Sequence, residues 1–116
     1  MQTIWIEIPV ADRQRAKRFY AAVTGEEGTD IANTDGHAIT VFAGEPTVSL
    51  NQADGFVPSR EGALPYFHVV DLDGALSAAA ASGGQVVDPP KARGAHGRFA
   101  LVHDSEGNAL YLHGAG

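Results

Sequence analysis

The sequence predicts an α+β fold in which one βαβββ module occurs twice. Segments of alternating apolar and polar residues, as in strands, precede segments with helical periodicity. Landmarks of the first half also return 59 residues later, with Ile8 recurring as Phe67 and Asp12 as Asp71. Because a lone module would leave one face of its sheet bare, we expect two curled, mixed sheets around a shared cup, with the helices on the outer faces.

Module one, residues 1–51, begins with a strand and a helix. The strand alternates Ile4, Ile6, Ile8 and Val10 with Trp5, Glu7 and Pro9. Asp12 is a helix-capping residue, and the predicted helix over 12–23 ends before Gly25. Its apolar face has helical spacing and consists of Ala16, Phe19, Tyr20 and Val23.

Three short strands complete module one. They are predicted near 27–31, 37–43 and 46–51. Turn-forming residues at 33–36 and 44–46 separate them. A polar linker, residues 52–63, then leads into the second module.

Module two, residues 64–116, repeats this order within the same single domain. Phe67 and Val69 stand for Ile8 and Val10, a helix is predicted over 72–82, and Gly84 stands for Gly25. The expected helix face is Ala75, Ala78, Ala79 and Ser82. Strands follow near 85–88, 98–103 and 108–113, with a loop at 88–97 and a hairpin turn at 104–108.

Composition narrows the function classes. The 116 residues are 44% hydrophobic and 19% charged, which is typical of a soluble globular protein. A net charge of −6 argues against a nucleic-acid partner, since phosphate binding needs a basic face. The absence of cysteine excludes thiolate chemistry and disulfides, and no apolar run would span a bilayer. We therefore expect no membrane partner and a cytoplasmic location.

Three segments together resemble the glyoxalase/bleomycin-resistance/dioxygenase superfamily, which has the vicinal oxygen chelate fold. They are IEIPVADRQRAKRFYAAVTG at 6–25, YFHVVDLDGALSAAAASGGQVV at 66–87 and GRFALVHDSEGNALYL at 97–112. The most specific parts are the Arg-Ala-x-x-Phe-Tyr run that ends in glycine and the Asp-x-x-Gly-Asn turn. The resemblance implies two βαβββ modules around a shared cavity and, as in many members, a homodimer.

The resemblance also locates four metal-ligand positions, and this sequence departs from the family there. The first-strand ligand lies seven residues before the capping aspartate, and the last-strand ligand lies three residues after the Gly-Asn turn. The four positions are occupied by Trp5, Ser49, Leu64 and Tyr111. Tryptophan and leucine offer no acceptor, so we predict no metal and no cofactor. A shift of two residues keeps the same strand faces and leaves a displaced metal site as an alternative, at Glu7, Asn51, Tyr66 and His113.

The residues expected on the cup face are aromatic with a few polar groups, as in small-molecule pockets. They are Trp5, Glu7, Ser49, Asn51, Tyr66, His68, Tyr111 and His113. Glu7 either meets a cationic ligand, acts as a base, or has an internal partner such as His68 or a backbone amide. Lys91 and Arg93 in the 88–97 loop either meet an anionic ligand or lie on an ordinary exposed loop. The sequence does not decide which face of the 98–103 strand carries His103.

The leading functional hypothesis is metal-free binding of a small, partly aromatic or cationic molecule. One alternative is a metal-dependent lyase, isomerase or dioxygenase that uses the displaced site. Another is a non-catalytic structural or interaction protein whose cup is filled by its own side chains. The sequence does not decide whether the protein is an enzyme, because this fold hosts many functions.

Overall fold

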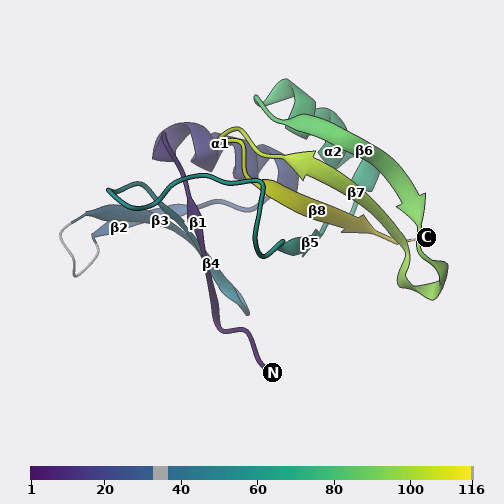
Figure 1. Ribbon diagram of the computed structural model, residues 1–116, viewed down its shortest axis with the longest axis horizontal. Coiled ribbons are helices and arrows are strands. Elements are labelled where there is room, and N and C mark those ends of the chain that lie inside the picture. Colours follow the sequence, from purple (N-terminus) through teal and green to yellow (C-terminus); the bar gives the residue numbers. More distant parts are fainter. Residues whose placement is uncertain (33–36, 116) are drawn as a thin grey trace.

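The structure is a computed structural model that describes residues 1–32 and 37–115, so the turn predicted at 33–36 lies outside the described residues. The described strands form two four-stranded sheets (Figure 1). The first sheet contains β1 (Trp5–Pro9), β2 (Thr29–Ala32), β3 (Ala38–Phe42) and β4 (Thr47–Asn51), in the order β1-β4-β3-β2. The second sheet contains β5 (Tyr66–His68), β6 (Gln85–Ala92), β7 (Arg98–His103) and β8 (Ala109–Gly114), in the order β5-β8-β7-β6. Each sheet pairs its first and last strands in parallel and is otherwise antiparallel, which confirms the predicted mixed α+β architecture.

The helices begin where the sequence predicts. In α1 (Arg13–Thr24) and α2 (Leu72–Ala81), the capping residues Asp12 and Asp71 each accept a bond from the backbone N–H three residues on. Gly25 ends α1 in the left-handed conformation, at φ 77°. In module two this conformation belongs to Gly83, at φ 92°, and not to Gly84, because α2 is two residues shorter than α1. No helix in the described part of the chain is long and apolar enough to cross a membrane.

The apolar face of α2 also differs from the predicted one. Leu72 and Leu76 are buried with Ala75 and Ala79, whereas Ala78 and Ser82 are only partly buried. Alanines contribute little apolar area, so the two leucines supply most of the surface that this helix buries. The residue-by-residue mapping from α1 therefore fails on this face, although the position of the helix is conserved.

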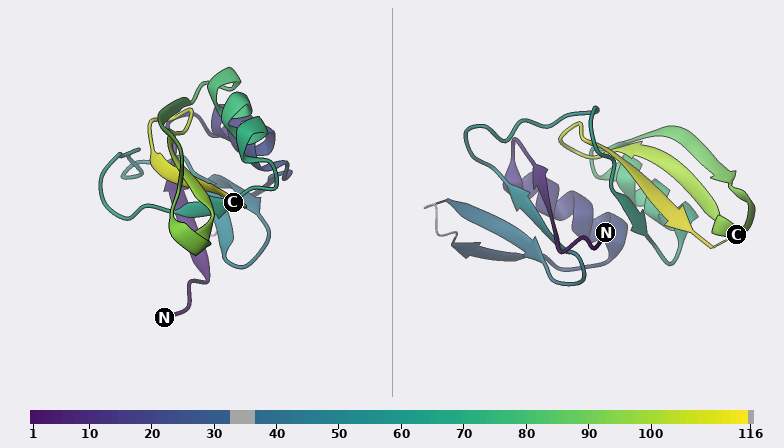
Figure 2. Two further views of the ribbon diagram at one scale, coloured as in Figure 1. Left: turned by 90° about the vertical axis from the view of Figure 1, so that its right-hand side faces the viewer. Right: turned by 60° about the horizontal axis from the view of Figure 1, so that its bottom comes forward.

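Both helices lie on the same side of the two sheets (Figure 2, right). The buried apolar residues of both modules form one core cluster, in which Phe19 and Tyr20 of α1 join Leu72 and Ala79 of α2. The opposite faces of the two sheets carry no helix. This one-sided packing leaves two open sheet faces on the same side of the molecule.

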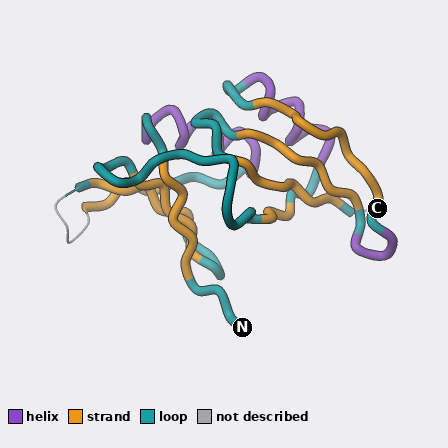
Figure 3. Tube along the Cα trace, viewed as in Figure 1, coloured by secondary structure: helices purple, strands orange, loops and turns teal. Residues whose placement is uncertain are grey.

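The first half of the segment predicted as a loop at 88–97 is strand. β6 continues to Ala92, with register shifts against β7 on both sides of Asp88 that accommodate Pro89 and Pro90. Proline is tolerated here because β6 is the edge strand of its sheet. A short 3₁₀ helix, Gly94–His96, then turns the chain into β7 (Figure 3).

The turn between β7 and β8 joins the modules. Asp104 accepts a 2.6 Å hydrogen bond from the buried Tyr20 hydroxyl. Glu106 accepts from the backbone N–H groups of Ala11 and Asp12 and from the Arg15 guanidinium, at 2.7–3.0 Å. Module two thereby holds the N-terminus of α1.

Candidate functional site

Strand alternation places all eight predicted site residues on the open faces. Ile6, Val48, Phe67 and Leu112 pack into the core on the helix side, so their strand neighbours point the other way. Across each parallel pair, the register then sets partners side by side. The open-face pairs are Glu7 with Ser49, Tyr66 with Tyr111 and His68 with His113.

The open face of the first sheet carries a chain of polar contacts. Trp5 donates from Nε1 to Ser49 Oγ at 3.0 Å, and Ser49 donates to Asn51 Oδ1 at 2.7 Å. Asn51 in turn donates from Nδ2 to Glu7 Oε2 at 2.9 Å. Ser49 and Asn51 are buried, while Trp5 is 47% exposed. The internal partner of Glu7 is therefore the Asn51 amide, and within the part of the chain that the structure describes neither His68 nor a backbone amide bonds to it.

The open face of the second sheet is aromatic. Tyr66 and Tyr111 stack with ring centroids 4.5 Å apart and planes 12° apart, and Phe99 meets Tyr66 edge-on at 5.7 Å. The Arg93 guanidinium lies 4.8 Å from the Phe99 centroid and 5.0 Å from the Tyr111 centroid. Its Nη1 lies 3.5 Å from Tyr66 Oη, at the limit of a hydrogen bond.

Phe99 was missing from the site predicted from the sequence, and Arg93 was kept only as one of two alternatives, a contact for an anionic ligand or an exposed loop residue. The signal for Phe99 was present, because it alternates with the buried Ala100 on a predicted strand. Arg93 follows β6, and its backbone N–H donates to the Gly97 carbonyl at 2.9 Å, which turns the chain back toward β7. That turn follows a strand end that the sequence does not predict, so the contact of Arg93 with the aromatic face follows only from the structure.

Two histidines extend the aromatic face. His68 Nδ1 and His113 Nδ1 are 2.9 Å apart, and His113 Nε2 lies 2.6 Å from the carbonyl oxygen of His96. Because a carbonyl oxygen only accepts, Nε2 of His113 carries the hydrogen, and in the neutral ring Nδ1 then accepts from His68. The Phe99 ring lies 4.8 Å from the His113 ring, so the histidines continue the aromatic row.

His103 shares the open-face side of β7 with Phe99, since it alternates with the buried Val102. Its Nδ1 is buried and has no hydrogen-bond partner among the described residues. Burial and the positive charge of Arg60 lower the pKa of His103. These surroundings favour the neutral ring.

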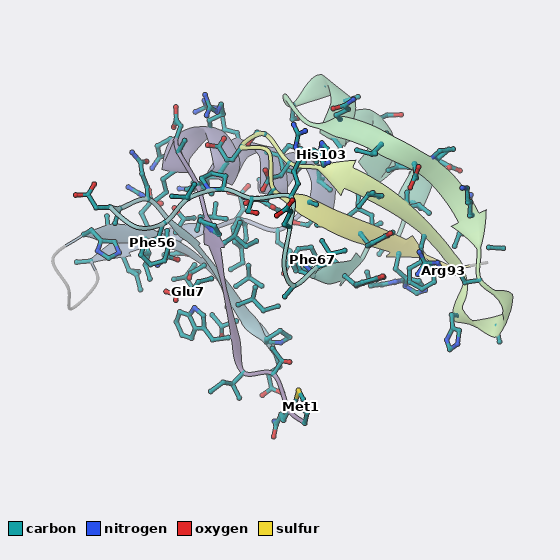
Figure 4. The ribbon with its side chains drawn as sticks, in the orientation of Figure 1. Met1, Glu7, Phe56, Phe67, Arg93 and His103 are labelled. Carbon is teal, nitrogen blue, oxygen red and sulfur yellow. The ribbon has the colours of Figure 1, made fainter. Side chains whose placement is uncertain are left out.

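The eight residues form two groups, one on each sheet. Among the described residues, no hydrogen bond or ring contact joins the first-sheet group to the second-sheet group. Glu7 and Arg93 accordingly lie on separate sheets (Figure 4). Cavities lie between the modules in the described part of the chain: Glu7 lines one of about 370 Å³, and Tyr66 and His68 line another of about 300 Å³.

The residues at the four family metal positions do not fit a metal ion. Trp5 and Ser49 are bonded to each other, Leu64 has no donor atom, and Tyr111 is stacked on Tyr66. The displaced set is divided between the two sheets, with Glu7 bonded to Asn51 on one of them. In the described ranges 1–32 and 37–115, no group of three or more His, Cys, Asp or Glu side chains is placed to hold a metal.

Comparison with known proteins gives one family match and many structural ones. The family model described as a glyoxalase-like domain matches residues 5–113. No curated protein matches the sequence. A glyoxalase/bleomycin resistance protein from Albidiferax ferrireducens is similar at 20% identity and a TM-score of 0.74, over 97% of both chains.

Two further structures are similar over nearly their whole length. A glyoxalase/bleomycin resistance protein/dioxygenase family enzyme from Burkholderia phytofirmans has 17% identity and a TM-score of 0.77, over 99% of both chains. An antibiotic binding protein from a Streptomyces species has 22% identity and a TM-score of 0.72, over 100% of this chain and 97% of that chain. At these identities the similarity shows a common fold.

Proposed function

The chain belongs to the glyoxalase-like domain family, and from that premise we propose that it binds a small, partly aromatic molecule over its open sheet faces without a metal. We further propose that it does so as a cytoplasmic homodimer and as one domain. The observation that carries the proposal is the identity and bonding of the residues at the family's ligand positions. Trp5 and Ser49 satisfy each other, and Tyr111 belongs to an aromatic stack.

The composition of the two faces supports a binding role. One face offers the half-exposed Trp5 above buried polar groups, and the other offers the half-exposed Tyr66 beside Tyr111. Aromatic walls with a few orienting polar groups are typical of sites for small organic molecules. A structurally similar protein is itself an antibiotic binding protein, which agrees with this role.

The homodimer proposal rests on the exposed open faces. Trp5 is 47% and Tyr66 48% exposed, although both stand beside well-ordered partners on a sheet. Large aromatic side chains are enriched at protein interfaces. A second copy would cover these faces and enclose the ligand between its own sheet and that of its partner. Sedimentation of a 12.1 kDa chain distinguishes the two states, and a monomer at high micromolar concentration would contradict the dimer.

The single tryptophan provides the test of binding. The metal-stripped protein is titrated with 2-naphthamide, a neutral aromatic probe, and binding is followed by calorimetry and by acrylamide quenching of Trp5. We expect saturable heat and a Trp5 that becomes less accessible to acrylamide as the probe covers the face. No heat and unchanged quenching up to the solubility limit of the probe would contradict the proposal.

A further inference from the structure

Arg93 is the arginine of the described residues whose guanidinium lies over aromatic rings. Within those residues Arg18 and Arg60 also lack a carboxylate oxygen within 4.0 Å, but neither lies over a ring in this way. Arg13, Arg15 and Arg98 each lie within 4.0 Å of a carboxylate oxygen, at Asp30, Glu106 and Asp73 respectively. Among the described residues, Arg93 has no such partner. Its contacts are the faces of Phe99 and Tyr111 and the hydroxyl of Tyr66.

These contacts hold the guanidinium in place without neutralising it. Ring faces and a phenol oxygen attract a cation, but they carry no full negative charge. Hydrogen bonding to Tyr66 is the largest cause that raises the pKa of Arg93, and hydrogen bonding to Tyr111 is the second. The backbone of Arg93 is also fixed by bonds across the turn, from its N–H to the Gly97 carbonyl and from the His96 N–H to its own carbonyl. A charged, planar donor group is thus already oriented and has no carboxylate partner within the described ranges 1–32 and 37–115.

The Tyr66 ring beside it is only half covered. Tyr66 stacks on Tyr111 through one face, yet it remains 48% exposed. A planar ring can therefore stack on Tyr66 while a group attached to that ring reaches Arg93. Guanidinium groups bind carboxylates through two parallel hydrogen bonds, and the two groups then share a plane.

We propose that this face recognises a planar aromatic anion, whose carboxylate pairs with Arg93 and whose ring stacks on Tyr66. The inference rests on the function proposed above and names its ligand class. It also replaces the expectation of a cationic ligand at Glu7, because one oxygen of Glu7 already accepts from Asn51. A net charge of −6 would repel a bulk anion, so an unpaired, preoriented arginine is the local feature that overcomes it.

The test compares three probes of the same shape by calorimetry in EDTA: 2-naphthoate, 2-naphthamide and 2-naphthylmethylammonium. We expect 2-naphthoate to bind about tenfold more tightly than the amide, as for one charge-assisted contact, and the ammonium to bind most weakly. The affinity of R93Q for 2-naphthoate should fall to its affinity for 2-naphthamide, while the affinity for 2-naphthamide stays as in the wild type. R93K keeps the charge but loses the planar guanidinium with its paired N–H donors. Its affinity for 2-naphthoate should lie between those of the wild type and R93Q.

R98Q is the matched control, because it removes one positive charge from the same sheet on the helix side, where Arg98 lies 3.7 Å from Asp73. It should leave the affinity for 2-naphthoate unchanged. Equal affinity of the wild type for the acid and the amide would overturn the inference and leave the proposed function standing. An equal loss in R98Q and R93Q would also overturn it, since a general field effect would then explain the preference. If none of the three probes binds, both binding proposals fail, and a change in the sedimentation of R93Q would then assign Arg93 to the contact with the second copy.

Discussion

The two modules share one backbone plan but differ on their open faces and in their hairpin turns. The first sheet presents a polar chain from Trp5 to Glu7, and the second presents stacked rings under Arg93. The β7–β8 turn binds α1 through Asp104 and Glu106. The corresponding β3–β4 turn exposes Glu45 and lines a cavity instead. The core and the strand order are therefore conserved between the modules, whereas the open sheet faces and the hairpin turns differ.

The largest loss of stability is expected from a substitution in the β7–β8 turn, compared with one in the β3–β4 turn. Asp104→Ala removes the acceptor for the buried Tyr20 hydroxyl and for the Asn108 backbone and side chain. Leaving such groups unpaired should lower the free energy of unfolding by about 3 kcal/mol or more, measured by urea denaturation. Glu45→Ala in the other turn is the control, and its free energy of unfolding should stay within about 0.5 kcal/mol of the wild-type value. Comparable losses in both variants would show that the turns do not differ in the way described.

A smaller loss is expected on the first open face. Ser49→Ala deprives Trp5 Nε1 of its acceptor and Asn51 Oδ1 of its donor at a buried position. We expect about 1–2 kcal/mol of lost stability and a shift of the Trp5 emission maximum. Unchanged emission would mean that Trp5 is not held by Ser49 in solution.

The stabilisation that the Glu106 contacts between the two modules provide should depend on pH. Burial alone would raise the pKa of Glu106, but hydrogen bonds from Arg15 and the Asp12 backbone outweigh it, and the net pKa is lowered. The unfolded state then binds more protons in acid, so this stabilisation is complete above the unfolded pKa and is lost as pH falls through the folded pKa. Glu106→Gln should cost about 1 kcal/mol at pH 7 and flatten the acid limb of the stability curve. An acid limb identical to that of the wild type would assign the pH dependence to other groups.

The smallest effect is expected at Glu7. Glu7→Gln keeps an oxygen for the Asn51 amide and removes only the charge. Stability should change by less than about 0.5 kcal/mol, and the affinity for 2-naphthoate should stay within about twofold of the wild type. A marked loss of affinity in a calorimetric titration would return Glu7 to the binding site as a charged contact.

The sequence was most informative where a residue acts locally. The capping aspartates, the apolar alternation and the 59-residue repeat predicted both helices and the described strands to within a few residues, except for β6, which continues to Ala92 through the first half of the predicted loop. The same alternation placed the eight site residues on the open faces, because a side chain's face follows from parity along the strand.

The sequence was least informative where distant segments meet. The Asn51 partner of Glu7 depends on the register between β1 and β4, which lie more than 40 residues apart. The reach of Arg93 depends on how far β6 continues past Pro89 and Pro90, and prolines in a sequence predict a loop more readily than an edge strand. Gly83 replaced Gly84 because the shorter α2 breaks the constant offset.

We propose above all that this member of the glyoxalase-like family binds its ligand without a metal. The most direct measurement is the dissociation constant of 2-naphthoate by calorimetry for protein stripped with EDTA and for protein supplied with stoichiometric Zn²⁺ or Mn²⁺. We predict the same constant in all three samples, because Trp5, Ser49, Leu64 and Tyr111 provide no coordination sphere. Binding that appears only after one equivalent of metal is added would contradict the account.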